Sequence, residues 1–189
     1  MPRVTIPGFV NAHSHAFQRA LRGRTEGGDF WAWREAMLDL ARGQTPGDVR
    51  SSYVAVYREL LRAGYTAVGE FHYLGFDAAV AAAKAAAETG IRFVLLYAAY
   101  AVEPFAQPSV ASYLEDVERL RRRGIDVGLA PHSVRACPPD WLEEVGRYAE
   151  RENLVLHVHA CEQPKEVEDC LAAHGLRPIE LLADRKSVV

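Results

Sequence analysis

The sequence predicts an α/β fold: an incomplete (β/α)₈ barrel that holds about strands 1–5 with their helices. Past residue 44, amphipathic helix patterns that mostly end at a glycine alternate with short apolar strands, as in a parallel sheet covered on its outer face. The alternative is a doubly wound nucleotide-binding sheet, but the first strand lacks the glycine-rich turn of that fold. A complete barrel needs about 250 residues. With 189 residues, this chain would stop short of closure.

The first strand is the run "PGFVNAHSH", residues 7–15. The first clear helix has Thr45 as N-cap, Pro46 in its first turn and Asp48 in capping-box position, and Gly64 ends it. The remaining strands are expected at Thr66–Phe71, Arg92–Tyr100, Asp126–Ser133 and Leu154–Ala160. The remaining helices are expected at Ala78–Thr89, Val110–Arg123, Pro139–Arg151 and Lys165–His174.

The pattern predicts one partial barrel domain over residues 1–183 and a tail, "DRKSVV", over residues 184–189. A common sequencing-adapter read would encode these six residues. We therefore expect a C-terminally truncated gene product whose tail is artefactual. Such an open piece of a barrel would expose apolar strand edges, through which it could form a homodimer.

Composition indicates an ordinary soluble globular protein, with 49% apolar and 25% charged residues. The 22 Lys and Arg residues against 25 Asp and Glu residues give a net charge of −3, which predicts no nucleic-acid partner. The N-terminus lacks a signal-peptide pattern and no apolar run could span a bilayer, so no membrane partner is expected. The three cysteines match no zinc or redox pattern, which favours a reducing, cytoplasmic location.

Two His-x-His motifs end the first and fifth predicted strands. His13 and His15 share one face of the first strand, and His157 and His159 share one face of the fifth, with His159 nearer the mouth of the barrel. His157 fits a packed residue of the lower layer better than a ligand, which leaves His13, His15 and His159. Three neutral imidazoles that converge on one point suit zinc, iron(II) or another borderline ion. Glu162, three residues after His159, suits a proton shuttle to metal-activated water, although it could also serve as a favourable acid at a helix N-terminus.

A third pair of polar residues follows the fourth predicted strand in the run "APHSVRA". His132 and Arg135 would lie at the mouth of the barrel, where a planar guanidinium can grip a carboxylate through two hydrogen bonds. The alternative is an ordinary surface arginine on a loop. Spacing alone does not separate the two readings.

At these residues the chain resembles the amidohydrolase superfamily of metal-dependent hydrolases, and within it the formimidoylglutamate deiminases of histidine degradation. The matching stretches are "PGFVNAHSHAFQRALRGRTE", "FWAWREAM", "GYTAVGEFHY", "APHSVRA" and "HACEQ", so the resemblance covers nearly the whole chain. The motif His-Ser-His alone marks only the superfamily. The runs "HAFQRA", "FWAWRE" and "EFHY", in this order, are much narrower markers.

The resemblance implies a role for eight residues. His13, His15 and His159 would hold one divalent metal, Zn²⁺ or Fe²⁺, and Glu162 would be the catalytic acid and base. The glutamate part of the substrate would be held by Gln18, Tyr73, His132 and Arg135. The implied reaction converts N-formimidoyl-L-glutamate to N-formyl-L-glutamate and ammonia.

The family pattern also includes a further histidine and an aspartate in later strands that are not in this sequence. We therefore expect this chain to be inactive by itself. Two alternatives stay open: a non-catalytic fragment, or another deaminase of the superfamily, of the guanine deaminase or chlorohydrolase type.

Overall fold

The computed structural model describes residues 3–184, and its chain divides into two compact units, Met1–Leu95 and Leu96–Val189. The predicted tail falls almost entirely on residues 185–189, which lie outside the described residues, so it stays a prediction. The single domain over residues 1–183 also stays a prediction. Among the described residues, no helix combines the length and the apolar character needed to cross a membrane.

The fold class is confirmed: four strands form one sheet in the order β1-β2-β3-β4, each followed by helix or loop on the way to the next. The first unit contains β1 (Phe9–Ser14), the 3-10 helix η1 (Ala16–Leu21), α1 (Phe30–Arg42), α2 (Pro46–Arg62), β2 (Tyr65–His72) and α3 (Phe76–Thr89). Strand β3 (Arg92–Ala99) contains the boundary between the units. The second unit continues with α4 (Val110–Arg122), β4 (Val127–Pro131), α5 (Pro139–Glu152), α6 (Pro164–His174) and α7 (Pro178–Asp184).

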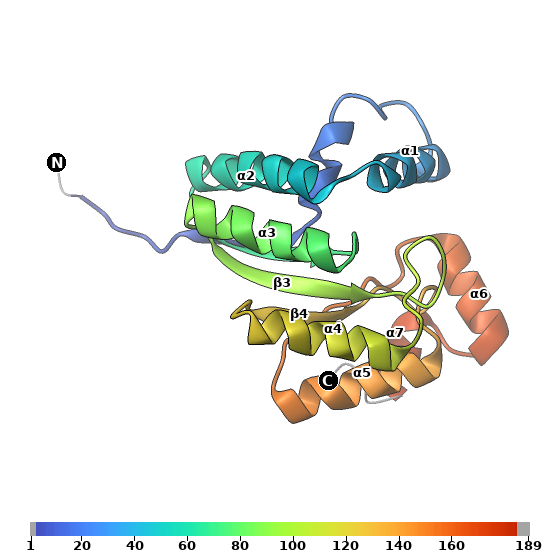
Figure 1. Cartoon of the computed structure of the whole chain (residues 1–189). Helices are drawn as coiled ribbons and strands as arrows, with labels where there is room; N and C mark the ends of the chain where they lie inside the picture. Colours follow the sequence, from blue (N-terminus) through green and yellow to red (C-terminus); the bar gives the residue numbers. More distant parts are fainter. Residues whose placement is uncertain (1–2, 185–189) are drawn as a thin grey trace. The chain divides into compact units, whose positions relative to one another are not determined.

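In the first unit, α2 and α3 lie side by side (Figure 1). The buried face of α3 consists of alanines, whose small side chains let the two helices approach closely: Ala78, Ala79, Ala81, Ala82, Ala85 and Ala86. Helix α2 buries Tyr53 and Tyr57. Strand β1 pairs in parallel with β2, and an irregular register near its end places Ser14 opposite Glu70.

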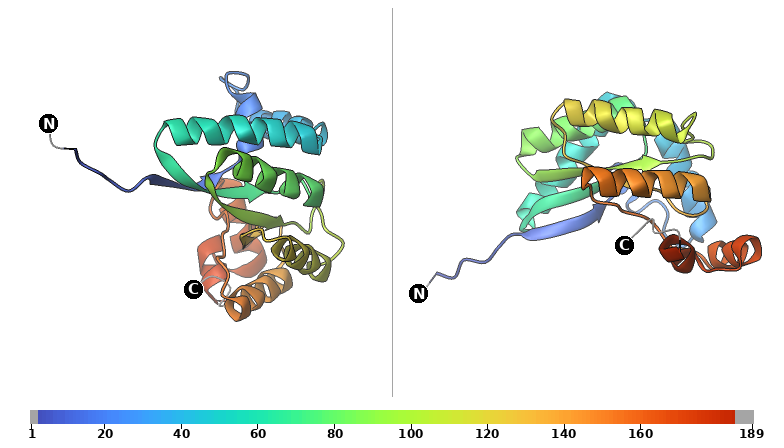
Figure 2. Two further views of the ribbon diagram at one scale, coloured as in Figure 1. Left: turned by 60° about the vertical axis from the view of Figure 1, so that its left-hand side comes forward. Right: turned by 90° about the horizontal axis from the view of Figure 1, so that it is seen from below.

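In the second unit, α4 and α5 lie next to each other (Figures 1 and 2). The rings of Tyr97 on β3 and Tyr113 on α4 stack with their centroids 5.7 Å apart. The Tyr113 hydroxyl donates to the Tyr97 carbonyl (2.8 Å) and accepts from the Ala130 amide (3.3 Å). This one side chain therefore joins α4 to both β3 and β4.

The predicted fifth strand differs in the structure. Its segment forms one isolated bridge, Leu129 to Leu156, instead of a strand. Its backbone amides at His157 and His159 donate to the carbonyls of Leu129 and His132, respectively. Over this interval β4 and its loop advance by three residues while the segment advances by two, so the register is irregular and no regular ladder forms.

Candidate active site

The first group of expected site residues lies where β1 ends. The Nε2 atoms of His13 and His15 are 3.0 Å apart. The Nδ1 atom of His15 is 3.1 Å from the Phe71 carbonyl oxygen, which can only accept, so Nδ1 carries the proton and Nε2 presents its lone pair. Two imidazole ligands of tetrahedral zinc stand about 3.3 Å apart, given Zn–N distances of about 2.0–2.1 Å. The two histidines therefore fit one zinc-sized ion.

Gln18 and Tyr73 belong to the same group. The Gln18 amide donates to the Tyr73 hydroxyl at 3.0 Å, and the Tyr73 ring meets the His15 ring edge to face, with centroids 5.6 Å apart. Gln18 comes from η1, directly after the histidines, whereas Tyr73 directly follows β2. The first unit thus brings together the four site residues that the sequence predicted for it.

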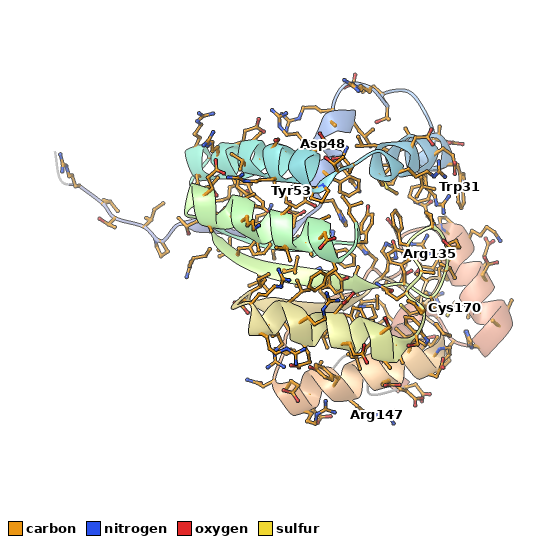
Figure 3. All side chains as sticks on the ribbon, in the orientation of Figure 1. Trp31, Asp48, Tyr53, Arg135, Arg147 and Cys170 are labelled. Carbon is orange, nitrogen blue, oxygen red and sulfur yellow. The ribbon has the colours of Figure 1, made fainter. Side chains whose placement is uncertain are left out.

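The second group lies at the end of β4 and in the segment after α5. The His132 and His159 rings pack with centroids 4.8 Å apart, and the His159 amide donates to the His132 carbonyl. Arg135, in the loop after β4 (Figure 3), forms an ion pair with Glu162. All four of these predicted site residues lie together in the second unit.

Electrostatics in the second group favours a neutral imidazole. Burial lowers the pKa of His159, while the nearby Glu162 carboxylate opposes that shift. A neutral imidazole is the form that binds metals. The three-histidine centre would need residues from both units, so the combination of His13, His15 and His159 stays a prediction.

A buried polar cluster behind the first group was not predicted. Glu70 on β2 is fully buried, and its carboxyl accepts the Ala16 amide at 2.7 Å and the Tyr57 hydroxyl at 3.3 Å. Burial raises the pKa of Glu70 to about 8, against the effect of its hydrogen bonds with Ala16, Ser14 and the two tyrosines of α2. The available signal was a glutamate inside an otherwise apolar strand, in the run "VGEF".

His72 belongs to the same buried cluster. Its Nδ1 lies 3.0 Å from the Tyr53 hydroxyl and its Nε2 lies 3.3 Å from the Gly75 carbonyl. Burial lowers the pKa of His72 to about 4 and raises that of Tyr53 well above its usual value. Both side chains are therefore neutral near neutral pH.

Glu166 on α6 is the corresponding unpredicted residue in the second group. Its side chain is buried, accepts the Glu162 amide at 2.8 Å and lies 3.6 Å from Nε of Arg135. It therefore contacts both members of the Arg135–Glu162 pair. In the sequence, Glu166 is only an acid in the first turn of a helix, where acids are common because they interact favourably with the helix dipole. Nothing in the sequence marks it as part of the site.

A family model described as "Amidohydrolase family" matches residues 4–187. A formimidoylglutamate deiminase of Pseudomonas aeruginosa is 36% identical over 97% of this chain and 47% of its own length. A 5'-deoxyadenosine deaminase of Methanospirillum hungatei is 28% identical over 95% of this chain and 40% of its own length. The chain thus spans less than half the length of these relatives.

Solved structures show the same fold. An adenosine deaminase from Xanthomonas campestris with bound zinc has a TM-score of 0.84 and 25% identity, over 95% of this chain and 42% of the other. A mutant atrazine chlorohydrolase from Arthrobacter aurescens, complexed with zinc and atraton, has a TM-score of 0.87 and 23% identity, over 96% of this chain and 46% of the other.

Proposed function

This chain belongs to the amidohydrolase family, and from that premise we propose that it supplies part of the active site of a metal-dependent formimidoylglutamate deiminase. The reaction would convert N-formimidoyl-L-glutamate to N-formyl-L-glutamate and ammonia. The observation that carries this proposal is the 36% identity to a formimidoylglutamate deiminase across 97% of the chain. Adenosine-type deaminases in the same comparison reach 27–30%.

His13, His15 and His159 would hold the metal, with Zn²⁺ the first candidate and Fe²⁺ the second. When bound, such an ion acts as a Lewis acid and activates water for hydrolysis of a C–N bond. The Nε2 atoms of His13 and His15 are 3.0 Å apart in the metal-free chain, so one donates to the other. To bind one ion, both Nε2 atoms would have to present a lone pair, so the histidine whose Nε2 donates would hold its ring proton on Nδ1 instead.

Glu162 would move the proton from water to the departing ammonia, and Arg135 would bind a carboxylate of the substrate's glutamate part. These two roles are linked, because the side chains of Arg135 and Glu162 form an ion pair with each other. A substrate carboxylate at Arg135 competes with Glu162 and leaves Glu162 free to carry protons. Gln18, Tyr73 and His132 would complete the polar lining that orients the substrate.

Binding is the primary test, because the chain spans less than half the length of its curated relatives. We would titrate the zinc-loaded chain with N-formyl-L-glutamate and, separately, with 5'-deoxyadenosine by calorimetry, and assay ammonia release from N-formimidoyl-L-glutamate. The matched variants are Arg135→Met and Arg147→Met. Arg147 is an exposed arginine on α5 (Figure 3), so its loss controls for removing one positive charge.

We expect N-formyl-L-glutamate to bind, Arg135→Met to weaken it at least tenfold, and Arg147→Met to change it less than twofold. A bound carboxylate that loses its bidentate partner forfeits a charge-assisted hydrogen bond pair, which supports this size of effect. Binding of 5'-deoxyadenosine alone would instead favour an adenosine-type deaminase, for which the 28% relative is the supporting observation. Zinc binding with no affinity for either compound would favour a non-catalytic chain.

A further inference from the structure

The turn that carries His13 and His15 is tied to β2 at three consecutive residues. Glu70 accepts the Ala16 amide at 2.7 Å and is hydrogen-bonded by the Ser14 side chain. The next residue on β2, Phe71, accepts the Nδ1–H of His15 through its carbonyl. Residues 14, 15 and 16 are therefore each held by Glu70 or by its neighbour, and Ser14 also pairs with Glu70 in the strand register.

The backbone at this turn requires an acceptor. Ala16 is the first residue of η1, and His15, which precedes it, provides no side-chain cap. Amides at the start of a helix have no partner within the helix, and a buried amide without a partner costs about 1–3 kcal/mol. The Glu70 carboxyl supplies that acceptor at 2.7 Å. A hydrophobic residue of similar size would fill the same space but leave the Ala16 amide without a partner.

A buried acid is a costly way to fill a core position. The Glu70 side chain is fully buried, and no cation pairs with it among the ion pairs of residues 3–184. Burying a carboxyl without a counter-charge is unfavourable, whereas an apolar side chain at the same place would be favourable. The benefit of Glu70 must therefore be something other than packing, and its contacts all converge on the histidine turn and on α2.

We propose that Glu70 is a positioning residue, which fixes the turn from Ser14 to Ala16 so that the Nε2 atoms of His13 and His15 stand at the separation that one divalent ion needs. This inference rests on the proposed function, because it assumes that His13 and His15 are metal ligands. Residues that orient metal-binding histidines from behind change metal affinity about 10–100-fold when they are mutated.

Four variants separate positioning from a general contribution to the core. Glu70→Gln keeps an oxygen at the same reach for the Ala16 amide. Glu70→Asp keeps the carboxyl but is shorter by one methylene, so the bond to Ala16 is lost or the turn shifts. Glu70→Met keeps the volume and removes the acceptor. Tyr57→Phe removes a hydroxyl from the same carboxyl and leaves the hydrogen bonds of residues 14–16 to β2 in place, so it is the matched control.

The measurement is zinc affinity of the whole 189-residue chain by competition with a chelator, beside the free energy of unfolding of each metal-free variant in urea. We expect Glu70→Asp and Glu70→Met to weaken zinc binding at least tenfold, and Glu70→Gln and Tyr57→Phe to stay within fivefold of wild type. The proposal is overturned if zinc affinity follows unfolding free energy across all variants, or if Glu70→Asp binds as wild type while Glu70→Gln does not. The comparison of Glu70→Asp with Glu70→Gln tests positioning by Glu70 even if Glu70→Met does not fold.

A second readout needs no metal. In the metal-free chain, ¹⁵N chemical shifts of the His15 ring report which nitrogen carries the proton. We expect the Nδ1–H form in wild type and in Glu70→Gln, and a mixed form in Glu70→Asp. If wild-type chain binds no zinc, the proposed function fails, while the ring shifts still support or refute positioning by Glu70.

Discussion

Acid should destabilise this fold through His72, and the variant His72→Asn should remove the effect. His72 is fully buried, and burial lowers its pKa to about 4 against the opposing influence of the Gly75 carbonyl. Its Nε2 donates to that carbonyl, so its Nδ1 accepts from the Tyr53 hydroxyl. Asparagine places an oxygen near the position of Nδ1, which keeps an acceptor for Tyr53 but cannot take up a proton.

The sign and size follow from the two pKa values. Because the folded pKa of His72 is below its usual 6.5, the unfolded chain binds the proton first as pH falls. The stability linked to a neutral His72 is therefore complete above about pH 6.5 and is lost as pH falls toward 4. At about 1.4 kcal/mol for each pH unit between the two values, the full loss is about 3 kcal/mol. Between about pH 7.5 and about pH 5, the loss is about 2 kcal/mol.

The assay is urea unfolding of wild type and His72→Asn at about pH 7.5 and about pH 5, followed by tryptophan fluorescence. Other titrating groups contribute to both proteins, so the difference between the two free energies of unfolding isolates His72. We expect wild type to have a larger free energy of unfolding than His72→Asn at about pH 7.5. At about pH 5 this difference should be smaller by about 2 kcal/mol. A difference that stays constant within about 0.5 kcal/mol across this range would refute a neutral, buried His72.

Three further predictions concern individual side chains. Thr45→Ala should lower the free energy of unfolding by about 1 kcal/mol in urea, because the Thr45 hydroxyl and the Asp48 carboxylate form the capping box of α2. Tyr113→Phe should cost about 1–3 kcal/mol in the same assay, because it removes a buried hydroxyl bonded to Tyr97 and Ala130. In thiol labelling of the native chain, the exposed Cys161 should react, while the buried Cys137, whose pKa is raised to about 11 by burial, should react only on unfolding.

The ends of the helices were predictable because short-range chemistry fixes them. Thr45, Pro46 and Asp48 predicted the start of α2, and the structure shows the complete capping box. Gly90 and Gly175 follow α3 and α6 with positive φ angles of 77° and 69°, the conformation that glycine adopts with least strain. Helices η1, α1 and α7 were not among the expected elements. Of these, η1 and α7 span only six and seven residues, which is too short for an apolar period to show.

The fifth strand marks a limit of a different kind. An apolar run of seven residues fits a strand equally well whether or not its neighbour keeps register with it. The register between this run and the end of β4 is irregular by one residue, which depends on the backbone of both segments and not on the run itself. The sequence pattern thus located the segment Leu154–Ala160, but it could not show whether the segment pairs regularly with β4.

The two His-x-His motifs and the run "APHSVRA" drew attention because they end predicted strands, where chemistry collects in parallel α/β folds, whereas Gln18 and Tyr73 entered only through the resemblance. The supporting residues could not be found in this way. Glu70, Glu166 and Tyr57 are ordinary members of a strand or a helix in the sequence, and only burial together with specific hydrogen bonds sets them apart. A buried acid inside an apolar strand is the one signal that could have drawn attention to Glu70 beforehand.

The buried cluster on β2 forms a hydrogen-bond chain with one direction. Because His72 donates to Gly75, its other nitrogen must accept from Tyr53, so the Tyr53 hydroxyl proton points to His72. Beside it, burial raises the pKa of Glu70 to about 8. Since its folded pKa exceeds the usual 4.5, the stability linked to neutral Glu70 is complete below about pH 4.5 and is lost as pH rises to about 8. The stability linked to neutral His72 is complete above about pH 6.5 and is lost as pH falls to about 4. The two groups together therefore favour the folded state most between about pH 4.5 and about pH 6.5.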